Sequence, residues 1–464
     1  MGLKDTANFA NIPAAYKSGK IYSILPITSG FGQYGDLTYS GPLQSRQNSS
    51  GSVVSSVANL PALNYHIVDG EVVGFPELQM AKNRTNFFKY SEYLNANWSA
   101  VGLTANLNST NIINVNGNFG ATKFMENTTN NSHNISQSVN LLSNRTYFFS
   151  IYVKPIDRVG FRVSSAGFVA GSTTNNSVEF DLDTFNIDKF DSSSSVARIQ
   201  KLPNNWYRCS CQFTANSSGG FSNIVIEVAS RNTNGSLDYS YTGDVNKGLA
   251  LYGAQLEANP NSSATEPSPY IVTDGNIVTR ANATIQSGAS TQSKEIFDRG
   301  YPVTLYWEGK IDRYATKQHA YSLLNVDSGS SGTDYLSLDF NSDTIIRIRR
   351  ANSSPSFTEY IGSVSYRTTK KDYLKIVVVF KNTTDYAIYI NGFFIQSFSG
   401  SAINWNFNGL RLGCGLASNN DASQRQSYNQ FFFWARGFTD AEASEVSSYN
   451  SYNEMATSSN FKLG

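Results

Sequence analysis

Charge is scarce in this sequence. Charged residues make up 15% of its 464 residues, the formal net charge is +1, and no block of five like charges occurs. Proteins that bind the nucleic-acid backbone need a basic surface, so we expect no nucleic-acid partner. Long apolar runs are also lacking. None approaches the roughly 18 residues that a membrane-spanning helix needs, so we expect no membrane insertion.

Cysteine and histidine are equally rare, with three of each. Cys209 and Cys211 lie two apart in a predicted strand, so their side chains point the same way, which is a poor geometry for a mutual disulfide. We interpret them as buried thiols that act as small apolar side chains. The ligands for a metal site are too few, and no H-E-x-x-H or P-loop motif occurs. We therefore expect no metal, no cofactor and no catalytic residue.

One nucleotide-binding motif does match by spacing. Residues 30–35, GFGQYG, fit the G-x-G-x-x-G pattern. That pattern requires a helix immediately afterwards, because the helix N-terminus holds the pyrophosphate. The residues that follow, 36–41 (DLTYSG), are typical of strand and turn. We reject a dinucleotide site here.

Aromatic residues are abundant, with 27 Tyr and 29 Phe, and Gly, Ser, Thr and Asn fill the segments between apolar runs. This composition is typical of short strands joined by polar loops and predicts an all-β fold. Asn391-Gly392 predicts a hairpin turn, and Thr439 with Glu442 predicts a capping box that begins a short helix. Strands are predicted at 146–154, 160–164, 178–182, 206–214, 222–229, 248–256, 303–311, 319–326, 335–340, 344–349, 373–381 and 386–390.

The stretch 251–281 divides the chain. It begins as an alternating strand and then breaks at Pro260, Pro267 and Pro269, which exclude helix and central strand. We expect residues 270–280 to pack back on the first domain, because an idle linker would not need Tyr270. The predicted domains are a β-sandwich at 81–282 and a second β-sandwich at 283–464. Residues 1–80 form an extended segment too polar to fold alone, which docks on a partner, a symmetry mate or the next domain. We interpret it as an assembly anchor.

An acidic row is predicted on one strand of the first domain. In residues 178–183, VEFDLD, the apolar residues alternate with Glu179, Asp181 and Asp183. Such a row can bind Ca²⁺, but period-two alternation is more typical of the solvated face of a sandwich.

The first domain contains a series of short motifs. In chain order they are RTN at 84–86, YS at 90–91, Trp98, FSIYVK at 149–154, FDLDT at 180–184, WYR at 206–208, GAQLE at 253–257, PSPYIVT at 267–273 and VTR at 278–280. Together they resemble a domain of bacteriophage virion proteins, found in tail fibres, head fibres and other surface proteins. The resemblance covers roughly residues 45–285 and implies a jelly-roll sandwich similar to carbohydrate-binding domains.

The second domain contains a hairpin segment at 375–398 with the motif Y-I-N-G, and a strand followed by a short helix at 430–449. These two segments resemble the central hairpin, and the last strand with its following helix, of the concanavalin-like and laminin-G sandwiches. Some concanavalin-like sandwiches hydrolyse glycans with paired carboxylates on one strand. The nearest pair here is Glu308 and Asp312, but Lys310 stands where the middle carboxylate belongs. We interpret Glu308 as part of a surface ion pair.

Glycans stack on exposed aromatic faces and bond to amides and carboxylates. Trp405 lies among alternating Asn residues in INWNFN (403–408) and is our one candidate glycan-binding residue, although the same alternation fits an inward-facing core residue.

Together these features and resemblances predict a non-enzymatic virion structural protein on the particle surface. It would be a head or tail fibre that displays lectin-like domains for attachment to host-surface glycans. Its residues 1–80 would bind other virion proteins, and a homotrimer is favoured by analogy with the family. The alternatives are a capsid decoration or connector protein without a ligand, and a polysaccharide depolymerase. A secreted adhesin is disfavoured, because the sequence lacks a disulfide framework.

Overall fold

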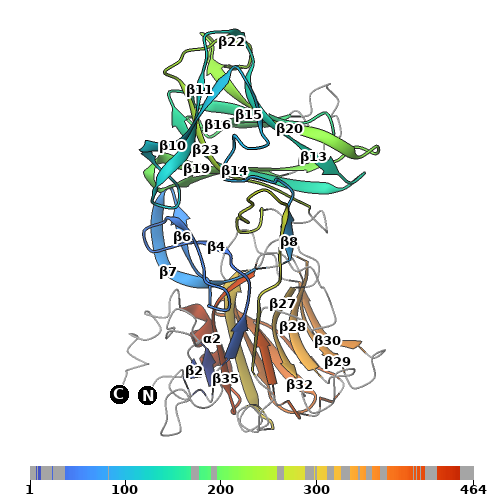
Figure 1. Cartoon of the computed structure of the whole chain (residues 1–464). Coiled ribbons are helices and arrows are strands. Elements are labelled where there is room, and N and C mark those ends of the chain that lie inside the picture. Colours follow the sequence, from blue (N-terminus) through green and yellow to red (C-terminus); the bar gives the residue numbers. More distant parts are fainter. Residues whose placement is uncertain are drawn as a thin grey trace.

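The protein consists of two β-sandwiches stacked end to end, with strands from the N-terminal part of the chain between and within them (Figure 1). The GFGQYG motif at 30–35, Asp312 and the third cysteine of the chain, Cys414, lie outside the residues that the structure describes. The computed structural model describes residues 7, 9–11, 23–24, 37–81, 83–168, 177–189, 196–258, 266–287, 297, 300–310, 318–324, 335–342, 345–351, 358–365, 374–400, 402–403, 405–407, 409–412 and 426–449.

The upper sandwich in Figure 1 packs a six-stranded sheet, here the β14 sheet, on a seven-stranded sheet, here the β20 sheet. Neighbouring strands pair antiparallel, and alternate residues such as Phe149 and Ile226 fill the core between the sheets. In sheet order, the β14 sheet is β10 (Leu103–Ile113), β11 (Phe119–Glu126), β23 (Gly248–Ala258), β14 (Thr146–Ile156), β19 (Trp206–Thr214) and β18 (Ala197–Leu202). The β20 sheet is β17 (Ile187–Lys189), β16 (Ser177–Asp181), β15 (Gly160–Ser164), β20 (Gly220–Arg231), β13 (His133–Leu141) and β9 (Ser99–Val101), with β21 (Leu237–Asp238) beside β20.

The lower sandwich packs a nine-stranded sheet, the β26 sheet, on a seven-stranded sheet, the β28 sheet. The helix α2 (Asp440–Ser448) covers the outer face of the β26 sheet, where Trp434 and Val446 are buried. The β26 sheet is β2 (Ser23–Ile24), β1 (Phe9–Asn11), β35 (Gln426–Trp434), β26 (Val303–Lys310), β31 (Leu374–Phe380), β32 (Asp385–Ile390) and β33 (Phe393–Ser399), joined at β35 by β7 (Glu71–Met80) with β6 (Leu63–Val68). The β28 sheet is β3 (Leu37–Ser40), β25 (Thr284–Ser287), β34 (Gly409–Leu412), β27 (Gln318–Leu324), β28 (Tyr335–Ser342), β29 (Ile345–Ala351) and β30 (Thr358–Ser365).

Strands from the N-terminal 80 residues are part of the lower sandwich. β1 and β7 both pair with β35, and β3 pairs with β25. Their side chains Phe9, Leu78 and Met80 belong to the same buried core as the strands of the C-terminal half. Our division at residue 80 therefore needs correction, since these strands are not a segment apart from both sandwiches. Of the docking surfaces that the sequence left open, they use the C-terminal domain. Burial of their apolar side chains holds them there. In the sequence these apolar residues are few and are separated by polar stretches, so the segment reads as polar.

The upper sandwich is consequently an insert in the lower one. Its two connections lie side by side: β8 (Arg84–Asn86) pairs antiparallel with β24 (Val278–Arg280), and the Ala283 N–H donates to the Ala81 carbonyl at 2.7 Å. We call residues 84–280 the inserted sandwich. The frame sandwich is the lower one, built from strands on both sides of the insert.

Residues between β3 and β7 cover the outer face of the β14 sheet. β4 (Ser45–Gln47), β5 (Val53–Ser55) and β6 lie there, and Val53 and Ile67 are buried against Trp206. The strap, residues 266–280, packs on the same face. Tyr270 and Ile271 are buried, and the Ser45 hydroxyl donates to the Tyr270 carbonyl at 2.9 Å. The prediction that 270–280 packs back on the first domain is confirmed for these residues.

Several other predictions are confirmed. The fold is all-β with antiparallel sandwiches, and β15 and β19 have the predicted bounds. Asn391-Gly392 forms the hairpin turn between β32 and β33, with positive φ at both residues. Thr439 and Glu442 form the capping box at the start of α2. Among the described residues, no helix has the length and apolarity needed to cross a membrane.

Candidate functional site

Three turns meet at the lower end of the inserted sandwich and enclose a polar cleft of about 440 Å³. One turn precedes β5, one joins β6 to β7, and one precedes β19. Two of the turns therefore come from the N-terminal segment and one from the inserted sandwich. The cleft is lined by Ser49, Ser50, Asp69, Gly70, Glu71, Val72, Lys201, Leu202, Pro203, Asn204 and Asn205.

The first turn is shaped by Asn48 and Gly51. The Asn48 side-chain oxygen accepts the N–H groups of Ser50 and Ser52, at 2.9 and 3.0 Å, which is the usual way in which Asn closes a loop. Gly51 has φ +76°, and a Cβ there would lie 2.5 Å from the Pro203 ring. The absence of a side chain at Gly51 therefore lets this turn rest directly on the third turn.

The other two turns depend on left-handed residues. Asp69 and Gly70 have φ of 50° and 88°, which suits the two-residue turn of the β6–β7 hairpin. Asn204 and Asn205 have φ of 58° and 59°, and Asn tolerates this conformation better than most residues. The Lys154 ammonium donates to the Asn204 carbonyl at 2.8 Å and so fixes the third turn to β14.

The cleft carries charge of both signs. Asp69 and Glu71 are exposed on one wall, and Lys201 is exposed on the other. Within the described part of the chain, none of these three groups forms an ion pair. The floor is less polar, because Leu202 is buried and Pro203 and Val72 are half-buried.

This arrangement can hold a ligand rich in hydroxyl groups. Carboxylates accept hydrogen bonds, the Lys201 ammonium donates them, and the Asn204 amide does both. The Asn205 side-chain oxygen already accepts a hydrogen bond from the Tyr207 hydroxyl at 3.0 Å, so this amide can act toward a ligand mainly as a donor. The small apolar floor can contact the C–H face of a sugar ring. The residues that line the cleft include no histidine.

Trp405 lies elsewhere, in the frame sandwich, and makes packing contacts. Its indole N–H donates to the Phe297 carbonyl at 2.6 Å. Its ring meets Phe380 and Tyr301 edge to face, with centroids 5.6 and 5.3 Å apart. These contacts match the inward-facing alternative that the sequence left open. A glycan contact at Trp405 stays a prediction.

Glu308 is buried on the outer face of the β26 sheet, so it is not the surface ion-pair residue that we predicted. The Tyr306 hydroxyl donates to it at 2.8 Å, and the Asn429 amide donates at 3.1 Å. The Gln430 amide is a third donor. These three donors satisfy the Glu308 carboxylate within the protein, so its observed role is to link neighbouring strands by hydrogen bonds.

The acidic row on β16 lies on the solvent side of the β20 sheet, while Val178 and Phe180 are in the core. Arg231 binds both oxygens of Asp181 at 2.8 Å, and Arg162 lies across the sheet from Glu179. The row is therefore compensated by arginines. Among the described residues, no three His, Cys, Asp or Glu side chains are placed to hold a metal ion. Cys209 and Cys211 are buried, as predicted, and neither forms a disulfide.

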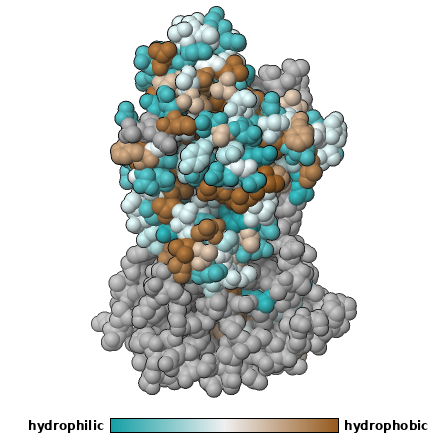
Figure 2. Space-filling model, in the orientation of Figure 1, coloured by the Kyte–Doolittle hydropathy of each residue, from teal (hydrophilic) through white to brown (hydrophobic). Residues whose placement is uncertain are grey.

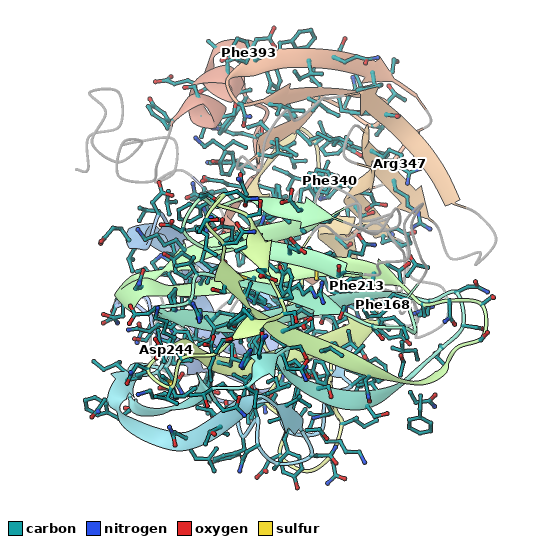
Figure 3. All side chains as sticks on the ribbon, turned by 90° about the horizontal axis from the view of Figure 1, so that it is seen from above. Phe168, Phe213, Asp244, Phe340, Arg347 and Phe393 are labelled. Atoms are coloured by element: carbon teal, nitrogen blue, oxygen red, sulfur yellow. The ribbon has the colours of Figure 1, made fainter. Side chains whose placement is uncertain are left out.

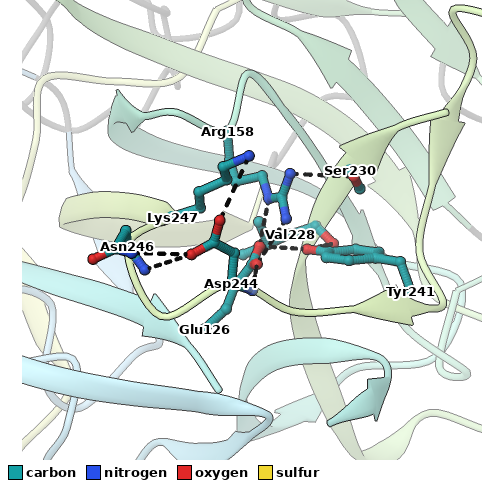
Figure 4. Close-up of polar contacts among 8 residues, drawn as sticks. All are labelled: Glu126, Arg158, Val228, Ser230, Tyr241, Asp244, Asn246 and Lys247. Carbon is teal, nitrogen blue, oxygen red and sulfur yellow. Dashed lines mark hydrogen bonds and ion pairs between the residues drawn. The ribbon is translucent and has the colours of Figure 1, made fainter. Parts of the chain in front are cut away.

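A second charged cluster at the other end of the inserted sandwich is also internally satisfied (Figure 4). Arg158 binds Glu126 through Nε and Nη2 at 2.6 and 2.8 Å. Tyr241 and the Asp244 N–H donate to the same carboxylate at 2.7 and 2.8 Å. Burial acts to raise the pKa of Glu126, but these bonds outweigh burial and hold its pKa below the usual range. The cluster leaves no acceptor of Glu126 for a ligand.

The cleft was not predicted from the sequence. Asp69-Gly70 between the alternating stretches 63–68 and 71–75 is a hairpin signal that was available, because D-G is a preferred two-residue turn. Asn204-Asn205 carries no such signal. The meeting of the three turns depends on contacts between segments more than a hundred residues apart.

Comparisons with known proteins give little further help. No family model and no curated protein matches the chain. Among solved structures, it is similar to the carbohydrate-binding module (CBM40) of a Ruminococcus gnavus sialidase bound to α2,3-sialyllactose, at 14% identity over 33% of this chain and 89% of that one, with a TM-score of 0.29. It is similar to a leech intramolecular trans-sialidase at 11% identity, over 35% of this chain and 25% of that one, TM-score 0.29. It is also similar to the binding domain of botulinum neurotoxin DC in complex with rat synaptotagmin II, at 13% identity over 37% of this chain and 41% of that one, with a TM-score of 0.29. These scores carry no argument about ligand or site.

Proposed function

We propose that this protein is a non-enzymatic attachment protein that binds hydroxyl-rich glycans in the cleft between its three turns. The observation that carries the proposal is the cleft itself, where two carboxylates, one ammonium, two amides and two hydroxyls face solvent without ion-pair partners in the described part of the chain. Closely spaced donors and acceptors of this kind can form hydrogen bonds with the neighbouring hydroxyl groups of a sugar.

The charge of the cleft narrows the ligand class. Asp69 and Glu71 against Lys201 leave one excess negative charge. A sugar with its own carboxylate or phosphate would be repelled by the wall that carries the acids. The proposal is therefore a neutral glycan, with uncharged hexose units bound more tightly than uronic or sialic acid units.

The context that we propose is the surface of a bacteriophage particle, as a head or tail fibre. Support for it comes from the order of sequence motifs in residues 45–285. A fibre carrying several copies would gain avidity from weak individual sites, because each bound site raises the effective concentration of the next.

A glycan array of bacterial surface polysaccharides tests binding and its location together. We expect the wild-type protein to bind neutral polysaccharides, and the double variant Asp69→Asn, Glu71→Gln to lose at least about tenfold in affinity, which corresponds to roughly 1.4 kcal/mol. Both positions are exposed, so the fold should not change. Asp157→Asn is the matched control: it removes one exposed carboxylate outside the cleft, and Asn tolerates the φ of 55° there.

Silence of the wild-type protein across the array would favour a capsid decoration or connector without a ligand. Binding that the double variant retains would place the glycan elsewhere, with Trp405 the next position to substitute. New reducing ends after incubation with capsule would favour a depolymerase. Glu308→Gln should leave that assay unchanged if Glu308 is the structural acceptor described above.

A further inference from the structure

The β6–β7 hairpin, which carries the two acids of the cleft, is interrupted by a bulge. Asn64 pairs with Glu77, and the next pair along the hairpin is His66 with Val73, so three residues of β7 face one residue of β6. A bulge bends the strand that carries it and re-aims the residues beyond it. Residues 66–73, beyond the bulge, are here called the tip of the hairpin.

The two parts of the hairpin are anchored on different sandwiches. The base, residues 77–80, pairs with β35 and places its apolar side chains in the frame core. The tip rests on the inserted sandwich, where Ile67 is buried against Trp206. Figure 1 shows β7 running from the inserted sandwich down to the frame. The positions of Asp69 and Glu71 in the cleft therefore depend on the angle between tip and base.

Apolar burial constrains the tip only in part. Val68 and Val73 are 54% and 40% exposed, and Figure 2 shows a similar mixture of polar and apolar side chains over the face of the inserted sandwich that it draws. At the bulge, Gly74 has φ +69°, and a Cβ added there would meet no atom of the described residues within 4 Å. This side of the bulge is open, so packing there does not set the angle.

The opposite wall of the cleft stands on a closely packed core. In Figure 3, Phe168 and Phe213 lie side by side, and their rings stack with centroids 4.0 Å apart in the core of the inserted sandwich. The Lys154 ammonium ties the turn at Asn204 to the same sandwich. The tip is thus the wall that needs a constraint of its own.

His66 and Glu77 supply a constraint that spans the bulge. The His66 Nε2 atom lies 2.9 Å from the Glu77 carboxylate, and the Glu77 side chain is only 3% exposed. Hydrogen bonds to an ionised group are stronger than neutral ones, and a low local dielectric strengthens them further. His66 belongs to the tip, three residues before Asp69, whereas Glu77 belongs to the base.

We propose that His66 and Glu77 are positioning residues, which set the angle of the tip and so hold the two acids where a glycan meets them. A binding site needs such a supporting shell, because contacts that are displaced by about 1 Å lose their geometry. This inference rests on the proposed function, since it assigns a role at the same cleft.

Spin labels on the full chain test the geometry without a ligand, through distances measured by pulsed electron paramagnetic resonance. In a Cys414→Ser background, a label at Val68→Cys reports on the tip, and a label at Ser218→Cys, on an exposed loop of the inserted sandwich, is the reference. The cysteines of the inserted sandwich are buried and should not react. We expect one narrow distance, which His66→Ala should shift or broaden. His66→Gln, whose amide can still donate to the carboxylate, should restore it.

Affinity for the neutral polysaccharide that binds best on the array tests the consequence. His66→Ala should weaken binding about tenfold, and His66→Gln should retain most of the affinity. Arg162→Ala is the matched control. Like His66, Arg162 is the more exposed partner of a buried carboxylate, that of Glu227 at 2.6 Å, but it lies on the β20 sheet away from the cleft. It should leave the affinity unchanged.

A label distance that His66→Ala leaves unchanged would overturn the proposal. An affinity loss that Arg162→Ala reproduces, or that His66→Gln fails to relieve, would overturn it as well. A wild-type protein that binds no glycan would overturn the proposed function instead, and the label distances would still decide whether His66 and Glu77 hold the hairpin.

Discussion

The backbone N–H of Ala283 donates to the carbonyl oxygen of Ala81 across a distance of 2.7 Å, although the whole inserted sandwich separates the two residues in sequence. Beside this bond, Arg280 donates to the Pro269 carbonyl at 2.6 Å and is buried together with Arg84. The entrance and exit of the insert are thus fixed to each other and to the strap.

The strap should carry much of the stability of the inserted sandwich. Tyr270 is 3% exposed, shares a hydrogen bond of 2.6 Å with the Ser91 hydroxyl and packs on Tyr152 and Tyr252. Tyr270→Ala should lower the free energy of unfolding by about 3 kcal/mol, as large buried aromatic truncations do. Val272→Ala, at an exposed position of the same strap, should change it by less than about 0.5 kcal/mol. Denaturant titrations give both numbers. If the two substitutions changed the free energy of unfolding equally, the strap would be a linker that does not stabilise the inserted sandwich.

Acid should unfold the inserted sandwich partly through Glu126. Because its pKa is held below the usual value, the carboxylate contributes stability above pH of about 4.3, and that stability is lost as the pH falls through the folded-state pKa. Glu126→Gln should cost about 3 kcal/mol at pH 7, since it leaves the buried Arg158 without its charge partner. The difference from wild type should shrink at pH 3. A difference that stays constant between the two pH values would show that the charge of Glu126 does not matter.

Alkali should loosen the frame sandwich through Tyr39. Burial raises the pKa of Tyr39 to about 12, although the Gln44 hydrogen bond and the charge of Arg280 act to lower it. A phenol whose pKa is raised on folding stabilises the protein fully below pH of about 10, and this contribution is lost as the pH rises through the folded-state value. Between pH 10 and 12 the wild type should lose on the order of 2 kcal/mol more than Tyr39→Phe. Parallel pH–stability curves for the two proteins would refute this assignment.

Local structure was predictable where the sequence pattern is local. The aromatic and β-branched runs in 146–154 and 206–214, the turn at Asn391-Gly392 and the capping box at Thr439 each predicted their elements, because strand propensity, turn chemistry and cap chemistry act over a few residues. Strands such as β13, HNISQSVNL, escaped notice, because Ser, Asn and Gln on the solvent face dilute the apolar period. The pairing of β1, β3 and β7 with strands near the C-terminus left no local signal at all, since Phe9 or Leu78 shows no preference for one sandwich over the other in sequence.

The candidate site was harder still. Trp405 was chosen for its aromatic ring and flanking amides, and the structure places it in packing contacts. The cleft depends on Gly51 fitting against Pro203, a contact that requires the N-terminal segment to lie on the inserted sandwich. The N-terminal segment lies there because the frame sandwich is built from strands on both sides of the insert. The sequence did not reveal that division of the frame, so it could not reveal the cleft either.

The central claim is that the frame sandwich is built from both sides of the insert, and the most direct measurement is thermal unfolding of residues 283–464 alone. This fragment lacks β1, β3 and β7, and with them Phe9, Leu78 and Met80 of the core. We predict no cooperative transition for it, and a cooperative transition for residues 1–81 joined to 283–464 by a short glycine-serine linker in place of the insert. A cooperative transition of the 283–464 fragment at the melting temperature of the joined chain would contradict the account.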